Sequence, residues 1–69
     1  MTQKEMVLRY IEDFGSITSL DAFRDLGVTR LAEIIRRLKE DQHDIIAETE
    51  EGKNRYGHVT RYARYRFRE

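Results

Sequence analysis

The 69-residue sequence contains no cysteine, and this absence excludes disulfide frameworks, thiol catalysis and zinc sites built from cysteine. No apolar run approaches the roughly 20 residues needed to cross a bilayer. The polar residues that follow Met1 do not resemble a signal peptide. We therefore expect a soluble, cytoplasmic protein with no membrane partner.

The residue patterns of common active sites are also lacking. The two histidines, His43 and His58, are isolated, no serine nucleophile has a plausible base, and no glycine-rich phosphate loop precedes a helix. Possible metal ligands do not recur at a regular spacing. The sequence predicts no enzymatic activity, no cofactor and no metal site.

Charge is abundant but unevenly placed along the chain. Charged residues make up 38% and hydrophobic residues 39% of the sequence, and the periodic order of the apolar residues argues against a disordered chain. The net charge is zero, which does not favour a polyanionic partner. However, residues 1–51 hold 7 Lys and Arg against 12 Asp and Glu, whereas residues 52–69 hold 6 against 1. This asymmetry suggests a basic surface near the C-terminus for a polyanion or an acidic partner; a solvated charged strand is the alternative.

The first stretch with helical periodicity covers about residues 3–14. Thr2 and Glu5 have the spacing of a capping box at its start, and Gly15 is suited to end it. Its apolar positions follow a helical pattern and are Val7, Leu8, Tyr10, Ile11 and Phe14. We expect this helix to be scaffold, with the ring of Tyr10 in or beside the core.

Two further helices are expected at about residues 19–26 and 30–41. In the first, capped by Thr18 or Ser19, the residues that recur at helical spacing are Leu20, Phe23 and Leu26. Gly27 suits the left-handed turn that follows, and Thr29 is a natural N-cap for the second helix. The apolar stripe of that helix is Leu31, Ile34, Ile35 and Leu38, and its opposite face carries Thr29, Arg30, Glu33, Arg36, Arg37 and Glu40.

Two strands are expected after the third helix, at about residues 44–50 and 58–68, joined by a polar turn over residues 51–57. Ile45 is the expected inward residue of the first strand. In the second strand the residues expected on one face are Val59, Ala63, Tyr65 and Phe67. Residues 16–18 are compatible with a short strand or with coil. Either Gln42 or His43 must take the left-handed position that a glycine would fill at the end of the third helix.

The six residues Asp25 to Arg30 resemble the turn of a helix-turn-helix domain, and the whole chain is similar to the small winged helix-turn-helix proteins common in phages. An ordinary helical hairpin in a mixed core remains the alternative for the turn by itself. The resemblance implies one α+β domain over residues 1–69, with three helices, a small antiparallel sheet and a C-terminal β-hairpin wing. It also implies sequence-specific binding of double-stranded DNA, with the third helix in the major groove and the wing on the backbone, in a phage or mobile-element transcription regulator.

The residues expected to contact DNA lie on the exposed face of the third helix and at the wing. They are Thr29, Arg30, Glu33, Arg36, Arg37, Lys53, Asn54, Arg55 and His58. Arginine can grip a guanine or a phosphate, and threonine can donate to a phosphate. A carboxylate can accept from cytosine, but Glu33 and Glu40 are expected more often to pair with arginines along the helix. A mobile, solvated turn is the alternative for the wing residues.

Three alternatives concern the partner. The zero net charge and the acidic first part favour a protein-interaction module on the same fold, such as a phage-encoded inhibitor or adaptor of a host protein. The alternation of arginines and aromatic rings over residues 61–68 resembles a stacking platform for single-stranded nucleic acid, but only Tyr62 is expected to be exposed there. A homodimer is left open, with the free face of the first helix and the strand edges as its candidate surfaces.

Overall fold

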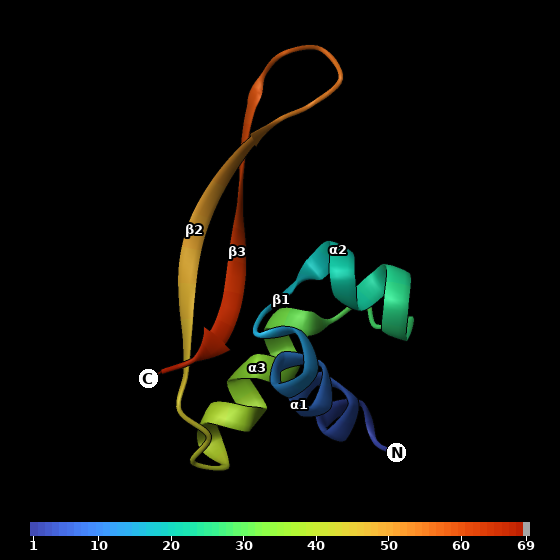
Figure 1. The fold of residues 1–69 in the computed structure, drawn as a ribbon, viewed down its shortest axis with the longest axis vertical. Coiled ribbons are helices and arrows are strands. Elements are labelled where there is room, and N and C mark those ends of the chain that lie inside the picture. The colour runs from blue at the N-terminus through green and yellow to red at the C-terminus, as the bar shows by residue number, and fades with distance from the viewer. Residues whose placement is uncertain (69) are drawn as a thin grey trace.

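The computed structural model describes residues 1–68, and its element order is helix, strand, helix, helix, strand, strand (Figure 1). The elements are α1 (Gln3–Phe14), β1 (Ile17–Thr18), α2 (Ser19–Asp21), its π-helical continuation η1 (Ala22–Leu26), α3 (Leu31–Glu40), β2 (Ile45–Lys53) and β3 (Val59–Phe67). This is the expected α+β winged helix-turn-helix architecture, with three helical segments, an antiparallel sheet and a C-terminal hairpin. No helix within residues 1–68 is long and apolar enough to cross a membrane.

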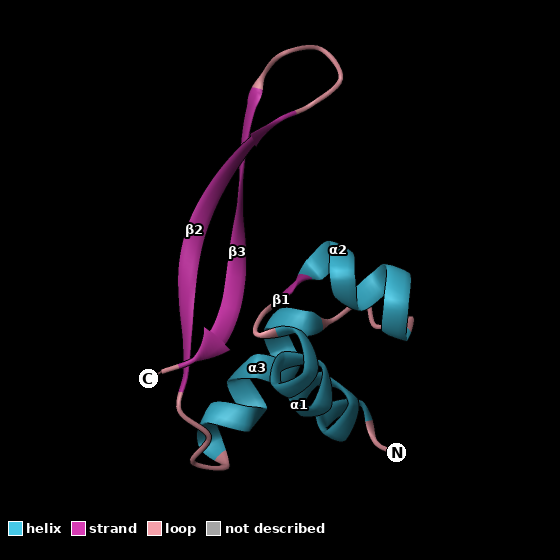
Figure 2. Ribbon diagram, viewed as in Figure 1, coloured by secondary structure: helices cyan, strands magenta, loops and turns pink. Residues whose placement is uncertain are grey.

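The sheet has three antiparallel strands in the order β1-β3-β2. Strand β1 pairs with β3 only near the base of the hairpin, where Ile17 is opposite Tyr65. Strands β2 and β3 pair along their whole length, from Ile45 opposite Phe67 to Lys53 opposite Val59. The hairpin therefore extends well beyond the helices, as Figure 2 shows, and the molecule is 39 Å along its longest axis.

The hydrophobic core lies where α1, α3 and the base of the sheet meet. Its buried members are Val7, Ile11, Ile17, Ala22, Val28, Leu31, Ile34, Ile35, Leu38 and Ile45. Tyr10, Tyr65 and Phe67 are half-buried against this cluster. The buried position of Ile45, the apolar stripe of α3 and the place of Tyr10 beside the core were all expected from the spacing of apolar residues.

Side-chain caps and left-handed residues set the ends of the helices. Thr2 caps α1 and Thr18 caps α2, each in a complete capping box. Gly27 is left-handed with φ of 68° and ends η1, as expected. Gln42, with φ of 75°, takes the left-handed position after α3, which the sequence required of Gln42 or His43.

The apolar face expected for residues 19–26 is wrong in two positions. Leu20 and Phe23 are exposed, and Ala22 is the residue of this segment that is fully buried. The expectation assumed α-helical spacing, whereas residues 22–26 form π-helical hydrogen bonds, which change the positions that share a face. Phe14 was also expected on an apolar face but is 71% exposed, because it is the last residue of α1 and extends past the core.

Other corrections concern the start of α3 and the hairpin. Arg30, not Thr29, is the N-cap of α3, and it makes no side-chain capping bond; the first helical bond runs from the amide of Ile34 to its carbonyl. The side chain of Val28 is buried in the core, and the chain turns into α3 only after this residue, so the helix begins one residue later than expected. Strand β2 continues through residues 51–53, which were expected in the turn, because these residues pair with residues 59–61 of β3. Val59 is exposed, since this part of the hairpin has passed the helices.

Candidate functional site

The exposed face of α3 is held together by its own ion pairs. Arg36 contacts Glu33 at 3.1 Å and Glu40 at 3.0 Å, and Arg37 contacts Glu33 at 3.2 Å. These pairs have the i, i+3 and i, i+4 spacing at which side chains meet on a helix. The expected pairing of the two glutamates with arginines of their own helix is therefore confirmed.

Glu33 is the centre of this cluster. Hydrogen bonds from Arg36 and then from Arg37 lower the pKa of its carboxyl from the usual value of 4.5 to about 2. The same contact raises the pKa of Arg36. At neutral pH the face therefore carries two guanidinium groups already engaged by carboxylates, so its net positive charge is small.

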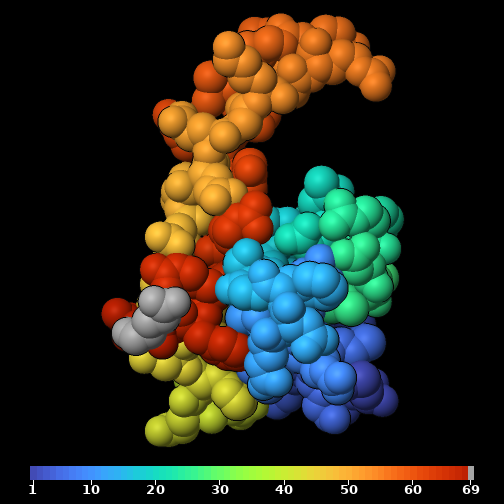
Figure 3. Space-filling view, in the orientation of Figure 1, coloured from blue at the N-terminus to red at the C-terminus, as the bar shows by residue number. Residues whose placement is uncertain are grey.

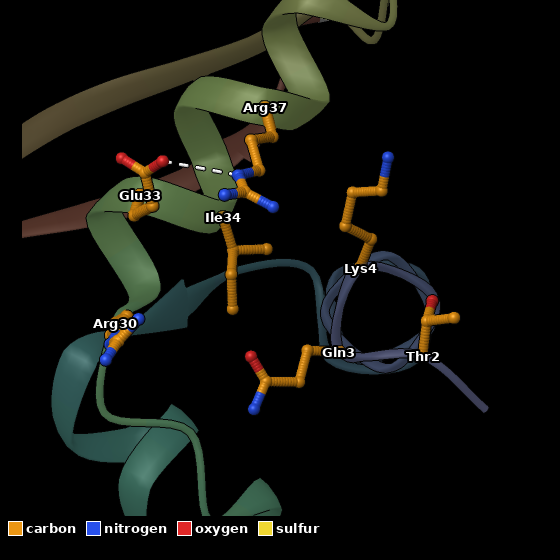
Figure 4. Close-up of a pocket in the computed structure, with 7 residues that line it drawn as sticks. All are labelled: Thr2, Gln3, Lys4, Arg30, Glu33, Ile34 and Arg37. Carbon is orange, nitrogen blue, oxygen red and sulfur yellow. Dashed lines mark hydrogen bonds and ion pairs between the residues drawn. The ribbon is translucent and has the colours of Figure 1, made fainter.

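Arg30 differs from these arginines because it contacts no carboxylate within residues 1–68. It is exposed and lines a cavity of about 320 Å³ between the start of α1 and α3. Figure 4 shows Arg30, Ile34 and Arg37 on one side of this cavity, with the first residues of α1 opposite them. Lys4, on the α1 side, is held by Asp41 at 2.6 Å. The cavity thus has a polar, cationic lining in which Arg30 is the unpaired charge.

The hairpin tip is ordered by Asn54. Its Oδ1 accepts hydrogen bonds from the amides of Tyr56 at 2.9 Å and His58 at 3.1 Å, and its own amide donates to the carbonyl of His58. An asparagine side chain that accepts a hydrogen bond from the backbone amide two residues later forms an Asx turn. Asn54 therefore shapes the tip, while the side chains of Lys53 and Arg55 are exposed on either side of it in sequence.

The basic C-terminal segment is largely neutralised by its neighbouring strand. Four arginines of this segment pair with carboxylates on or next to β2, in the pairs Arg61–Glu51 at 3.4 Å, Arg64–Glu50 at 2.8 Å, Arg66–Glu48 at 2.6 Å and Arg68–Asp44 at 3.1 Å. The antiparallel register causes this, because it places the carboxylates of residues 44–51 alongside the arginines of residues 61–68. The charge asymmetry of the sequence therefore does not become a continuous basic face of the hairpin.

Nine of the 13 Lys and Arg side chains contact a carboxylate within residues 1–68. The four that do not, within the same range, are Arg30, Lys39, Lys53 and Arg55. Three of these were among the expected contact residues and lie at the start of α3 and at the hairpin tip. Lys39 was missed because it lies off the helical face considered, although the last turn of a helix is where a cation is favoured.

Of the other expected contact residues, Thr29 and His58 are exposed. His58 is next to the tip and Thr29 lies in the bend before α3. The hairpin overhangs the body, and Figure 3 shows the hollow that this leaves between the tip and the α2 region. The structure therefore separates the expected residues into two groups, one along α3 and one at the tip.

The model of the winged helix-turn-helix domain family matches residues 2–69 of the chain. No curated protein and no solved structure matches it.

Proposed function

The chain belongs to the winged helix-turn-helix domain family, and on this premise we propose that it binds double-stranded DNA in a sequence-specific manner. In this proposal α3 enters the major groove, whose base edges present distinct donors and acceptors, and the hairpin tip contacts the backbone. The observation that carries the proposal is the location of the unpaired cations. Arg30 is at the start of α3, and Lys53 and Arg55 are at the tip, which are the two parts that would face the duplex.

The proposal gives the residues different roles. Arg30, Lys53 and Arg55 neutralise phosphates. Thr29 donates to a phosphate near the start of α3, and His58 adds a contact next to the tip. Asn54 acts by holding the shape of the tip, as its two accepted hydrogen bonds support.

We propose that the cluster of Glu33, Arg36 and Arg37 contributes to sequence specificity. Its arginines would leave Glu33 and bind the DNA when the duplex is bound. In the free protein Glu33 holds both arginines. A duplex offers phosphates and guanines as competing partners for the same guanidinium groups. The cluster would then weaken binding to arbitrary DNA and allow tight binding only where the bases compensate for the lost ion pairs.

Binding of a labelled duplex at a series of salt concentrations tests this function. Each neutralised phosphate contributes about −0.9 to the slope of log K against log salt, so three unpaired cations predict a slope of about −2.7. The variants Arg30→Ala, Lys53→Ala and Arg55→Ala should each make the slope shallower by about 0.9. The matched control is Arg68→Ala, because Arg68 lies at the other end of the hairpin and is engaged by Asp44 at 3.1 Å. Equal effects of Lys53→Ala and Arg68→Ala would contradict the proposed tip contact.

The resemblance to phage proteins leads us to propose further that this protein is a cytoplasmic transcription regulator of a phage or mobile element. A reporter carrying DNA selected by the purified protein tests this. Its expression should change when the protein is supplied, and the change should be lost with Arg30→Ala.

A second candidate function is an interaction module for a host protein. The observation that favours it is the pairing of nine cations with carboxylates, which leaves little free positive charge. It predicts that the folded protein does not bind duplex DNA even at about 50 mM salt, where phosphate contacts are strong. The same titration therefore separates the two functions.

A further inference from the structure

The outer side of α1 carries an apolar groove that the proposed DNA contacts do not use. It has a volume of about 350 Å³ and is lined by Met1, Met6, Arg9, Tyr10, Asp13, Phe14, Asp25 and Leu26. Phe14 in this lining is 71% exposed. A contiguous apolar surface rimmed by charge is typical of an interaction site on a small protein.

The residues of α1 in this groove form a pattern that is complementary to its own reverse. Met6, Tyr10 and Phe14 follow one another at intervals of four residues, so they form one stripe along the helix. Arg9 and Asp13 lie beside this stripe, also four residues apart, with opposite charges. The first series is centred on residue 10 and the second on residue 11, so the two centres lie one residue apart.

Contacts within the chain fix part of this surface. The hydroxyl of Tyr10 donates to Asp25 of η1 at 2.6 Å, and this hydrogen bond raises the pKa of the tyrosine. The rings of Tyr10 and Phe14 lie with their centroids 4.6 Å apart. The middle of the stripe is therefore preorganised, which lowers the entropy cost of binding a partner.

We propose that this groove is the interface for a second copy of the chain, with the two α1 helices antiparallel across a two-fold axis near Tyr10. A two-fold interface requires a surface that is complementary to itself. In this arrangement Phe14 of each copy lies over Met6 of the other, a favourable sulfur–aromatic contact. Arg9 of each copy likewise faces Asp13 of the other. The charge complementarity of this pair identifies a second copy as the occupant.

The arrangement leaves the proposed DNA contacts free. None of the groove residues lies on α3, β2 or β3. A dimer through α1 therefore presents two copies of α3 and two hairpin tips, as binding to paired half-sites requires. Because α1 has 12 residues and is about 18 Å long, the contact is small and we expect micromolar self-association. The inference does not depend on DNA binding.

Sedimentation equilibrium over a range of protein concentrations tests the interface. The wild-type mass should rise from 8.3 kDa towards twice that value as the concentration increases. The variant Phe14→Ser should remain at the monomer mass. The matched control is Leu20→Ser, which removes an exposed side chain outside the groove and should leave self-association unchanged. Circular dichroism should show the same helix content in both variants.

Charge reversal distinguishes the contact between copies from the ion pair inside one helix. Arg9→Asp places acids at both positions, and Asp13→Arg places bases at both, so each variant should be monomeric when alone. An equal mixture of the two should form dimers, because each copy then supplies the charge that the other lacks. A wild-type protein that stays monomeric at all concentrations, a dimeric Arg9→Asp variant, or a monomeric mixture would each overturn the proposal. Capture of another protein by a monomeric chain would assign the groove to that protein instead.

Discussion

Replacing Glu33 by glutamine is expected to make the protein bind arbitrary duplex DNA more tightly. Glu33 is the carboxylate that contacts Arg37, at 3.2 Å, whereas Arg36 also contacts Glu40 at 3.0 Å. The change therefore releases one guanidinium fully and leaves the other with a partner. Loss of a carboxylate that makes no ion pair within residues 1–68, such as Glu12, would release no such group.

The expected size of the effect follows from one additional phosphate contact. The slope of log K against log salt should become steeper by about 0.9, which at about 0.1 M salt corresponds to roughly eightfold tighter binding. A double variant, Glu33→Gln with Arg37→Ala, should return to the wild-type slope because the released cation is removed.

Fluorescence anisotropy with a short random-sequence duplex, between about 50 and about 200 mM salt, measures both quantities. Glu12→Gln is the matched control: it removes the same charge from an exposed position on α1, and Glu12 has no ion pair within the described residues. Glu12 lies outside the proposed contact residues, and exposed charges separated by more than the Debye length of about 10 Å at 0.1 M salt interact only weakly. If Glu33→Gln weakened binding, or changed the slope no more than Glu12→Gln, the proposed role of Glu33 as a restraint on Arg37 would be refuted.

Further predictions concern stability and pH. Gly27→Ala should destabilise the fold by about 1–2 kcal/mol, because φ at this position is 68° and only glycine adopts it without strain. Gln42→Gly should stabilise the fold by about 1 kcal/mol, because φ at this position is 75°. Thermal unfolding should therefore show melting temperatures shifted in opposite directions by the two changes. Ile17→Ala should lower the free energy of unfolding by about 2–5 kcal/mol, because Ile17 is fully buried. A core of this size supplies only about 3–5 kcal/mol, so little of this variant should be folded. Ile17→Val should lower the free energy of unfolding by about 0.5–1.5 kcal/mol, and urea titrations should show that it is still folded in the absence of urea. The lowered pKa of Glu33 means that its stabilising contribution is fully present above pH 4.5 and is lost as the pH falls towards 2. The difference in melting temperature between the wild type and Glu33→Gln should therefore narrow over that pH range.

Several parts of this protein could be read from the sequence because they depend on neighbours in the chain. The capping box at Thr2, the turn at Gly27 and the apolar stripe of α3 involve residues within four positions of one another, whereas the cap of α2 was left open between Thr18 and Ser19. The pairing of Glu33 with Arg36 and Arg37 is of the same kind. Helical geometry alone brings these groups together, so their spacing was sufficient to predict them.

The tertiary structure decided the distribution of free charge and of exposed apolar surface. Arg64 and Glu50 are 14 positions apart, and their ion pair depends on the register of β2 and β3, which no local pattern determines. The composition of the basic C-terminal segment therefore could not predict that carboxylates on or next to β2 neutralise its arginines, because this too depends on the register. The exposure of Phe14 and Phe23 likewise depends on where α1 ends relative to the core and on the π-helical turn of η1. The sequence by itself determined the three helical segments, the two strands of the hairpin and their order. Contacts between distant segments decided that β1 is a strand, because it pairs with β3, and decided which cations and which apolar side chains were left available for a partner.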